Sequence, residues 1–117
     1  MKYNKIICFD LDNTICKTYA NDYSNSFPIK KNINFINKLY SNGYYIKIFT
    51  SRYMGRSSEN ILAAKKRGYK FTLNQLKKWN LKYHKLIFGK PSYDLFVDDK
   101  ALFYKKDWVS ELKKLIN

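Results

Sequence analysis

Apolar residues along this chain follow two different spacings. Short runs of strand length alternate with longer stretches in which apolar residues recur every three or four positions, as on one face of a helix. The strand-like runs are residues 3–9, 44–50, 86–88 and 93–97. The helix-like stretches are residues 29–41, 59–68, 72–80 and 108–116. Gly68 interrupts the middle of the chain, so its two helical stretches are either separate helices or one interrupted unit.

The predicted order is strand, helix, strand, helix, helix, strand, strand, helix. Strands that alternate with helices favour a three-layer, Rossmann-like α/β fold, with a mostly parallel sheet and helices on both faces. A chain of 117 residues suits one domain spanning residues 1–117. Residues 14–28 lack periodicity and contain Asn, Asp, Ser and Pro, so we expect a loop or short flap there.

Polar and charged residues gather where the predicted strands end. In open α/β sheets the active site lies beyond the carboxyl ends of the strands. The segments at such positions are Asp10 to Thr14, Thr50 to Arg52, Gly89-Lys90 and Asp98-Asp99. They contain four of the nine acidic residues of a chain with net charge +14, which favours an active site over a solubilising surface.

Asp10 and Asp12 are the most informative pair at these ends. Residues i and i+2 of a strand point to the same side, so the pattern aims two negative charges at one place. Such repulsion indicates a cation or a reaction that needs both carboxylates. With Asp98 and Asp99 they make an oxygen-only set, which is typical of Mg²⁺ rather than zinc. His84 is the only histidine, and we expect it at the surface.

The net charge of +14 comes from 20 Lys and 3 Arg. Such a surface attracts phosphate or nucleic acid, but solvated lysines explain it equally well. We favour the second interpretation because nucleic-acid binders use more arginine, which leaves nucleic acid as the less favoured partner. No apolar run is long enough to span a membrane and no signal peptide opens the chain, which predicts a cytoplasmic protein. Cys8 and Cys16 are then expected to be free thiols.

The pattern Asp10-x-Asp12-x-Thr14 after an apolar strand resembles motif one of the haloacid dehalogenase (HAD) superfamily. Thr50 resembles its second motif and Lys90 its third. Asp98-Asp99 resembles the fourth, in the same order over nearly the whole chain. The segments most similar to the small capsule-biosynthesis phosphatases of this superfamily are Thr50-Ser51-Arg52, Gly89-Lys90-Pro91 and Val97-Asp98-Asp99-Lys100-Ala101.

The resemblance implies a role for each motif residue. Asp10 would be the nucleophile that forms an aspartyl-phosphate, and Asp12 would protonate the leaving oxygen and then activate water. Thr50 and Lys90 would hold the phosphoryl group, and Lys90 would also neutralise charge at Asp10.

Mg²⁺ is the cofactor that the resemblance implies. Its ligands would be Asp10, Asp98 and the backbone carbonyl of Asp12. Asp99 would orient these groups or bind the metal through water.

Further substrate contacts are expected from the turn after Thr50. Ser51 and Arg52 would contact the substrate together with Thr50 and Lys90. Arg56 is another candidate for gripping a second anionic group, although a surface arginine is the alternative interpretation for both arginines.

The chain has no room for a cap domain. Only 35 residues separate Thr14 from Thr50 and 39 separate Thr50 from Lys90, and the predicted helices and flap fill both gaps. A capless site is open to water and to large substrates. We therefore expect either the polar, mobile segment Ile15–Pro28 or a neighbouring subunit of a homo-oligomer to cover it.

Together these features predict a Mg²⁺-dependent phosphatase that acts on a small phosphorylated substrate. The favoured substrate is a sugar phosphate of surface-polysaccharide (capsule) precursor synthesis. One alternative is a polynucleotide 3′- or 5′-end phosphatase, suggested by the charge and the open site. Another is a non-catalytic basic module that binds nucleic acid or regulates a partner.

Overall fold

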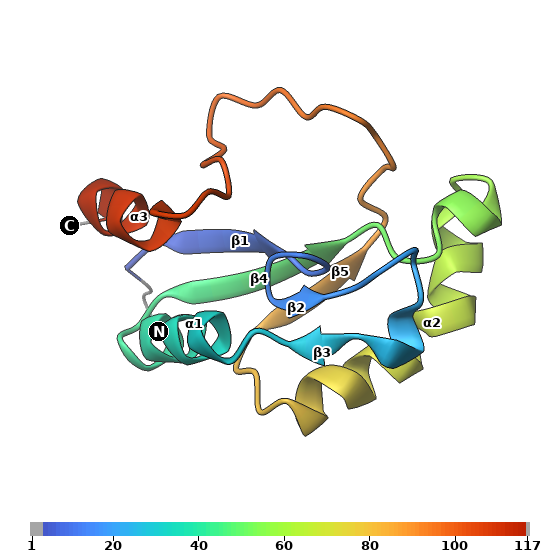
Figure 1. Cartoon of the computed structure of the whole chain (residues 1–117), viewed down its shortest axis with the longest axis horizontal. Coiled ribbons are helices and arrows are strands. Elements are labelled where there is room, and N and C mark those ends of the chain that lie inside the picture. The colour runs from blue at the N-terminus through green and yellow to red at the C-terminus, as the bar shows by residue number, and fades with distance from the viewer. Residues whose placement is uncertain (1–3, 117) are drawn as a thin grey trace.

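The computed structural model describes residues 4–116, and its main sheet has three parallel strands (Figure 1). The strands are β1 (Ile6–Asp10), β4 (Tyr45–Thr50) and β5 (Lys85–Phe88), in the order β1-β4-β5. The prediction of an α/β fold with a parallel sheet is therefore confirmed. Tyr3, the predicted start of the first strand, lies outside the described residues.

In residues 4–116 three α-helices accompany the sheet: α1 (Lys30–Ser41), α2 (Ile61–Lys78) and α3 (Trp108–Ile116). α1 ends as its sequence predicts, because Asn42 caps it and Gly43 follows with a φ of +93° that favours glycine. The boundaries of α3 agree with the predicted helix over 108–116.

α2 is one continuous helix, so Gly68 does not break it. The glycine is instead required for packing. A Cβ at this position would overlap the ring of Tyr53, which lies directly against the helix. Gly68 therefore marks a close approach of two segments, which sequence alone does not distinguish from a helix interruption.

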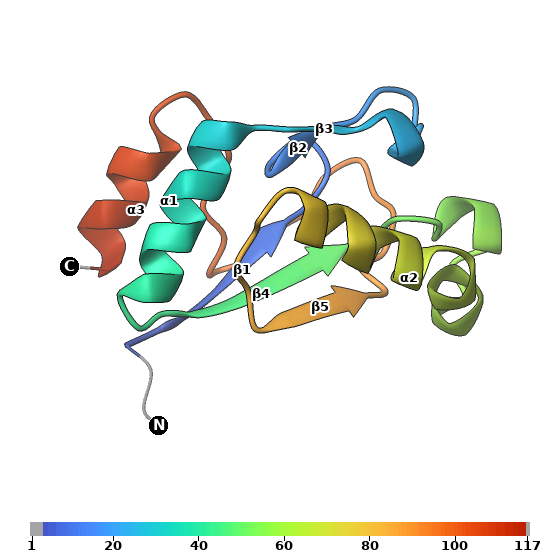
Figure 2. The same ribbon diagram turned by 90° about the horizontal axis from the view of Figure 1, so that it is seen from below.

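The hydrophobic core lies on one face of the sheet. Phe9 contacts the ring of Trp108 in α3, and Phe88 contacts Tyr69 in α2. The pairing of Phe9 with Ile48 and of Ile48 with Leu86 puts both phenylalanines on this face. α1 packs onto the same core through residues Ile33, Ile36 and Leu39. Figure 2 shows α1 and α3 side by side, in agreement with the contact between Phe35 and Trp108.

The opposite face of the sheet is open among residues 4–116. Ile6 is 65% exposed there, and Cys8 and Lys85 are exposed as well. Within the described part of the chain the predicted helices on both faces are therefore not found, and there are two layers where three were expected. The physical reason is that α3 packs on Phe9 and Phe35, beside α1, rather than on the other side of β1.

Residues 15–28, which we call the flap, are packed against the core. They form a small antiparallel pair, β2 (Cys16–Lys17) with β3 (Phe27–Pro28), and a short 3₁₀ turn at Tyr23–Asn25. The buried flap residues are Ile15, Cys16, Thr18 and Tyr23. The flap is thus anchored, in contrast to the loosely attached, mobile lid that its polar composition suggested.

Residues 91–107, which we call the arm, leave the end of β5 and arch away from the sheet before α3 (Figure 1). The predicted strand over 93–97 is wrong, because the described arm contains no helix or strand. Leu95 is 82% exposed and Val97 is 91% exposed. A short apolar run forms a strand only where a neighbouring strand pairs with it.

Local contacts direct the arm away from β1. The backbone N–H of Ser92 donates to the carboxylate of Glu59 at 3.0 Å, which draws the start of the arm toward the segment before α2. The carboxylate of Asp98 accepts from the N–H of Lys100 at 3.0 Å and closes a turn. The arm is therefore held by these contacts and not by hydrogen bonds to a neighbouring strand.

His84 lies at the amino end of the sheet and is packed, not a free surface residue. Its ring stacks between Tyr40 and Tyr45, and its Nδ1 accepts from the N–H of Ile46 at 3.0 Å. Cys8 and Cys16 are free thiols, as expected. Within residues 4–116 no helix is both long and apolar enough to cross a membrane.

Candidate active site at the carboxyl edge of the sheet

Three predicted site residues meet at the carboxyl edge of the sheet. Asp10 ends β1, Thr50 ends β4, and Lys90 follows β5 after Gly89. The N–H of Lys90 donates to the carbonyl of Thr50 at 3.2 Å, which ties the chain after β5 to the end of β4. Gly89 has a φ of +106°, so the sharp turn into Lys90 requires glycine.

Asp10 and Lys90 form an ion pair with 3.3 Å between Nζ and Oδ1. The Asp10 side chain is 38% exposed and the Lys90 side chain 13% exposed. Partial burial raises the pKa of Asp10 above its usual value, and the nearby charge of Lys90 opposes this rise. The pair therefore presents an accessible carboxylate beside a fixed positive charge.

Lys90 is also held by the start of the arm. Its ammonium group lies 5.4 Å from the ring centre of Tyr93 and 5.7 Å from that of Phe96. Burial alone would lower the pKa of Lys90, but a hydrogen bond with Tyr93 and the charge of Asp10 outweigh it and leave the pKa raised. Lys90 thus stays charged at the sheet edge over the ordinary pH range.

The chain turns sharply after Asp10. Leu11 is fully buried, and its carbonyl accepts from the N–H of Ile15 at 2.8 Å. Asn13 has a φ of +64°, a left-handed conformation that Asn tolerates. The turn separates the two carboxylates, so that Asp10 faces Lys90 while Asp12 faces Arg52.

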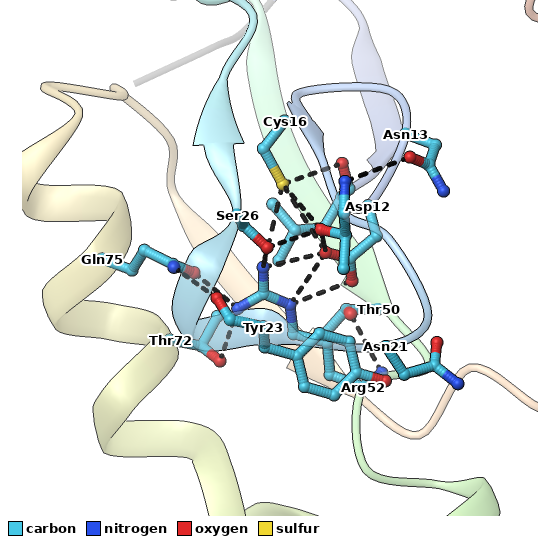
Figure 3. A network of polar contacts seen from close by, with 12 residues as sticks. Asp12, Asn13, Cys16, Asn21, Tyr23, Ser26, Thr50, Arg52, Thr72 and Gln75 are labelled. Carbon is cyan, nitrogen blue, oxygen red and sulfur yellow. Dashed lines mark hydrogen bonds and ion pairs between the residues drawn. The ribbon is translucent and has the colours of Figure 1, made fainter.

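Arg52 grips Asp12 with a forked contact (Figure 3). Its Nη2 lies 2.8 Å from Oδ1 of Asp12, and its Nε lies 2.9 Å from Oδ2. The Arg52 side chain is fully buried and the Asp12 side chain is 20% exposed. Arg52 was expected to contact substrate, but its guanidinium is enclosed by protein and binds Asp12 instead.

The other donors of Arg52 are also used within the protein. Nη1 donates to Oε1 of Gln75 at 2.6 Å and to the hydroxyl of Thr72 at 3.4 Å, and the ring of Tyr23 lies 4.8 Å from the guanidinium carbon. Sequence reasoning missed Thr72, Gln75 and Tyr23. One signal was available in the sequence: Thr72 and Gln75 are polar, are spaced i, i+3 and lie on the core-facing side of a helix, where apolar residues are usual. Such a pair indicates a buried polar partner.

Thr50 differs from its expected position in the site, whereas the position of Ser51 leaves its predicted contact with substrate open. The Thr50 side chain is on the helix-covered face and is 1% exposed, and its hydroxyl accepts from the N–H of Arg52 at 3.1 Å. Thr50 therefore positions the turn that carries Arg52. Ser51 is partly exposed at the start of that turn.

Arg56 contacts the outer side of the flap. Its Nη2 donates to the carbonyl of Asn21 at 2.9 Å, and its guanidinium carbon lies 5.1 Å from the Tyr23 ring and 5.0 Å from the Tyr53 ring. The residue is exposed. Arg56 is therefore the accessible arginine of this region, while Arg52 is the buried one.

Asp98 and Asp99 are not brought to Asp10. Both are exposed on the arm, and contacts with the Lys100 amide and with Asp99 lower the pKa of Asp98. Among residues 4–116 no three His, Cys, Asp or Glu side chains gather to hold a metal ion. A divalent cation at Asp10 and Asp12 would also face the positive charges of Lys90 and Arg52. As arranged, Asp10 and Asp12 do not complete the predicted Mg²⁺ site without Asp98.

A surface hollow of about 510 Å³ lies elsewhere, along α1. Its lining residues are Asn34, Phe35, Asn37, Lys38 and Ser41. These side chains include no carboxylate, histidine or cysteine. The chemistry therefore points to the edge formed by Asp10, Asp12 and Lys90, which is open rather than a deep pocket.

Comparison with known proteins supports the fold. No protein-family model and no curated protein matches the chain significantly. The crystal structure of an MCSG target from Vibrio cholerae is similar, with a TM-score of 0.83 over 96% of this chain and 96% of that one. At 24% sequence identity this similarity concerns the architecture alone.

Proposed function

We propose that the protein is a phosphomonoester hydrolase of the HAD type in which Asp10 is the nucleophile. The observation that carries the proposal is the ion pair of Asp10 and Lys90 at the carboxyl edge of a parallel sheet. Asp12 follows two residues later, and the order of the remaining motif residues along the chain supports the same family.

The reaction would proceed in two displacements on phosphorus. An Asp10 oxygen attacks phosphorus as the bond to the leaving oxygen breaks, and Asp12 gives that oxygen a proton. Water then attacks the aspartyl-phosphate and gives its proton to Asp12. The bond between phosphorus and Asp10 breaks, which releases phosphate and restores both carboxyl groups.

Lys90 would supply the electrostatic stabilisation in both steps. Its ammonium group is already 3.3 Å from Asp10, so a phosphoryl group bonded to Asp10 would lie beside it. A fixed positive charge lowers the barrier wherever negative charge develops on the phosphoryl oxygens.

A sugar phosphate is the substrate that we favour, with capsule precursor metabolism as its setting. A polynucleotide end is the second candidate, favoured by the open sheet face. Lys85 is exposed on that face, and Lys90, which lies beside the rings of Tyr93 and Phe96, pairs with Asp10. Positive charge and aromatic rings together suit a single strand of nucleic acid.

Phosphate release from a substrate panel tests the proposal. The panel contains sugar phosphates and 3′- and 5′-phosphorylated oligonucleotides, assayed with the wild-type protein and Asp10→Asn. We expect release by the wild type and a loss of at least about a thousandfold in the variant, because the nucleophile is gone. Equal release by both proteins, or none by either, would refute the hydrolase.

Mg²⁺ dependence is a separate prediction. Asp98 would have to leave its exposed position on the arm to join Asp10, so the requirement for metal is decided by assay with Mg²⁺ and with a chelator. Loss of activity on chelation, restored by Mg²⁺, is the expected result. Undiminished activity in the presence of the chelator would contradict the requirement for Mg²⁺ without contradicting the hydrolase activity.

A further inference from the structure

Arg52 occupies an unusual position for an arginine, because its side chain is fully buried in a protein of only 117 residues. Its donors all face groups of the same chain. In addition to Asp12, Thr72 and Gln75, Nη2 lies 3.4 Å from the Ser26 hydroxyl and 3.7 Å from the Cys16 sulfur. A buried guanidinium is stable only when its charge and its hydrogen bonds are satisfied in this way.

The planar fork of arginine suits this arrangement. Nε and Nη2 reach the two oxygens of Asp12, while Nη1 reaches Gln75 on the other side. A lysine would offer a single charged nitrogen and could not bridge both partners in fixed directions. Arg52 therefore fixes the direction of the Asp12 carboxylate as well as supplying a counter-charge.

The flap is part of the same network. The Thr18 hydroxyl donates to Oδ1 of Asp12 at 2.5 Å and also contacts Ser26. From the other side, Nε2 of Gln75 donates to the carbonyl of Tyr23 at 2.8 Å. Asp12, the flap and α2 thus meet at one buried guanidinium.

We propose that Arg52 is a positioning residue that holds Asp12 in its working direction and anchors the flap around it. The first half rests on the proposed function, in which Asp12 transfers the proton. The second half, the anchoring of the flap, does not depend on any activity.

Leaving-group dependence tests the positioning role. An alkyl phosphate needs a proton on its leaving oxygen, whereas p-nitrophenyl phosphate does not, because p-nitrophenolate leaves unaided. We expect Arg52→Gln to lower kcat/KM, which reports formation of the aspartyl-phosphate, about a hundredfold on the alkyl ester and less than about tenfold on the aryl ester. Arg52→Lys, which keeps the charge, should recover part of the loss.

Two variants serve as references in this assay. Asp12→Asn should show the same preference for the aryl ester, and the exposed Arg67→Gln on α2 should match the wild type. Equal losses on both esters in Arg52→Gln, with the preference kept in Asp12→Asn, would overturn the positioning role. Lack of the preference in Asp12→Asn itself would instead contradict the proton transfer assigned to Asp12 in the proposed function.

Alkylation of Cys16 tests the anchoring without any substrate. Cys16 is buried in the flap beside Arg52, and burial raises the pKa of its thiol to about 11, so it reacts slowly while the flap is closed. In a Cys8→Ser background, Arg52→Gln and Arg52→Lys should react with iodoacetamide at least about tenfold faster, and Arg67→Gln should not. Unchanged Cys16 reactivity in both Arg52 variants would overturn the anchoring, even if the protein hydrolyses no ester.

Discussion

The flap and the arm are both long segments of little regular structure, yet they differ in what surrounds their side chains. The polar flap buries Ile15 and Thr18 and joins a network centred on Arg52. The arm, which has a similar share of apolar residues, leaves Leu95 and Val97 exposed. Whether a segment is held in place thus depends on the residues that surround its side chains and not on its average hydropathy. Asp12, the proposed acid, is hydrogen-bonded to the anchored flap, whereas Asp98 lies on the exposed arm.

Proteolysis should show the largest difference between the two segments. Trypsin needs a locally unfolded stretch, and we expect it to cut at the exposed arm residues Lys100, Lys105 and Lys106 at least about a hundredfold faster than at Lys17 in the flap. Mass spectrometry of a time course identifies the first cuts. Early cleavage after Lys17 would contradict the anchored flap.

Truncating one apolar side chain in each segment compares their contributions to stability. Ile15→Ala removes a fully buried side chain and should lower the free energy of unfolding by about 2–5 kcal/mol. Leu95→Ala removes a side chain that is 82% exposed and should change it by less than about 0.5 kcal/mol. Urea unfolding measures both, and similar losses for the two variants would mean that the arm is packed in solution.

Gly68→Ala tests the packing behind the flap. The added methyl group would push the Tyr53 ring, whose centre is 4.8 Å from that of Tyr23 in the flap. Overpacking costs about 1–3 kcal/mol, and alanine regains about 1 kcal/mol in helix propensity. We therefore expect the free energy of unfolding to fall by about 1 kcal/mol. Lys66→Ala, on the exposed side of α2, is the control, and a stabilised Gly68→Ala protein would show that Tyr53 does not pack there.

Lys90→Met should have a clear effect on the titration of Asp10. Lys90 lowers the pKa of Asp10, so its removal should raise that pKa further above the ordinary 3.8. Since folded Asp10 holds its proton more tightly than the unfolded chain does, stability falls as pH rises through this window, and more so in the variant. Carbon NMR of the Asp10 carboxyl group measures this pKa. An unchanged pKa in the variant would contradict the ion pair of Lys90 and Asp10.

Much of the fold could be predicted from local patterns. The spacing of apolar residues is enough to identify α1 and α3, and the carboxyl ends of β1 and β5 lead directly to Asp10 and Lys90. These features depend on residues close together in the sequence or on a general property of parallel sheets.

What the sequence could not reveal depends on distant partners. Nothing near Arg52 indicates that Gln75 and Asp12 enclose it, since its contacts span 23 and 40 residues. The apolar run from Leu95 to Val97 predicts a strand, but pairing depends on where the rest of the arm is held. Buried polar networks and strand pairing are both tertiary effects, and they override local propensity.

Amide hydrogen exchange of the wild-type protein tests the contrast between the two segments most directly. The account predicts slow exchange at Ile15, Thr18 and Ile29, whose N–H groups are bonded in and around the flap, and near-unprotected exchange over residues 93–97 of the arm. Protection of alternate amides over 93–97, as in a paired strand, or rapid exchange at Ile15 and Thr18, would contradict it.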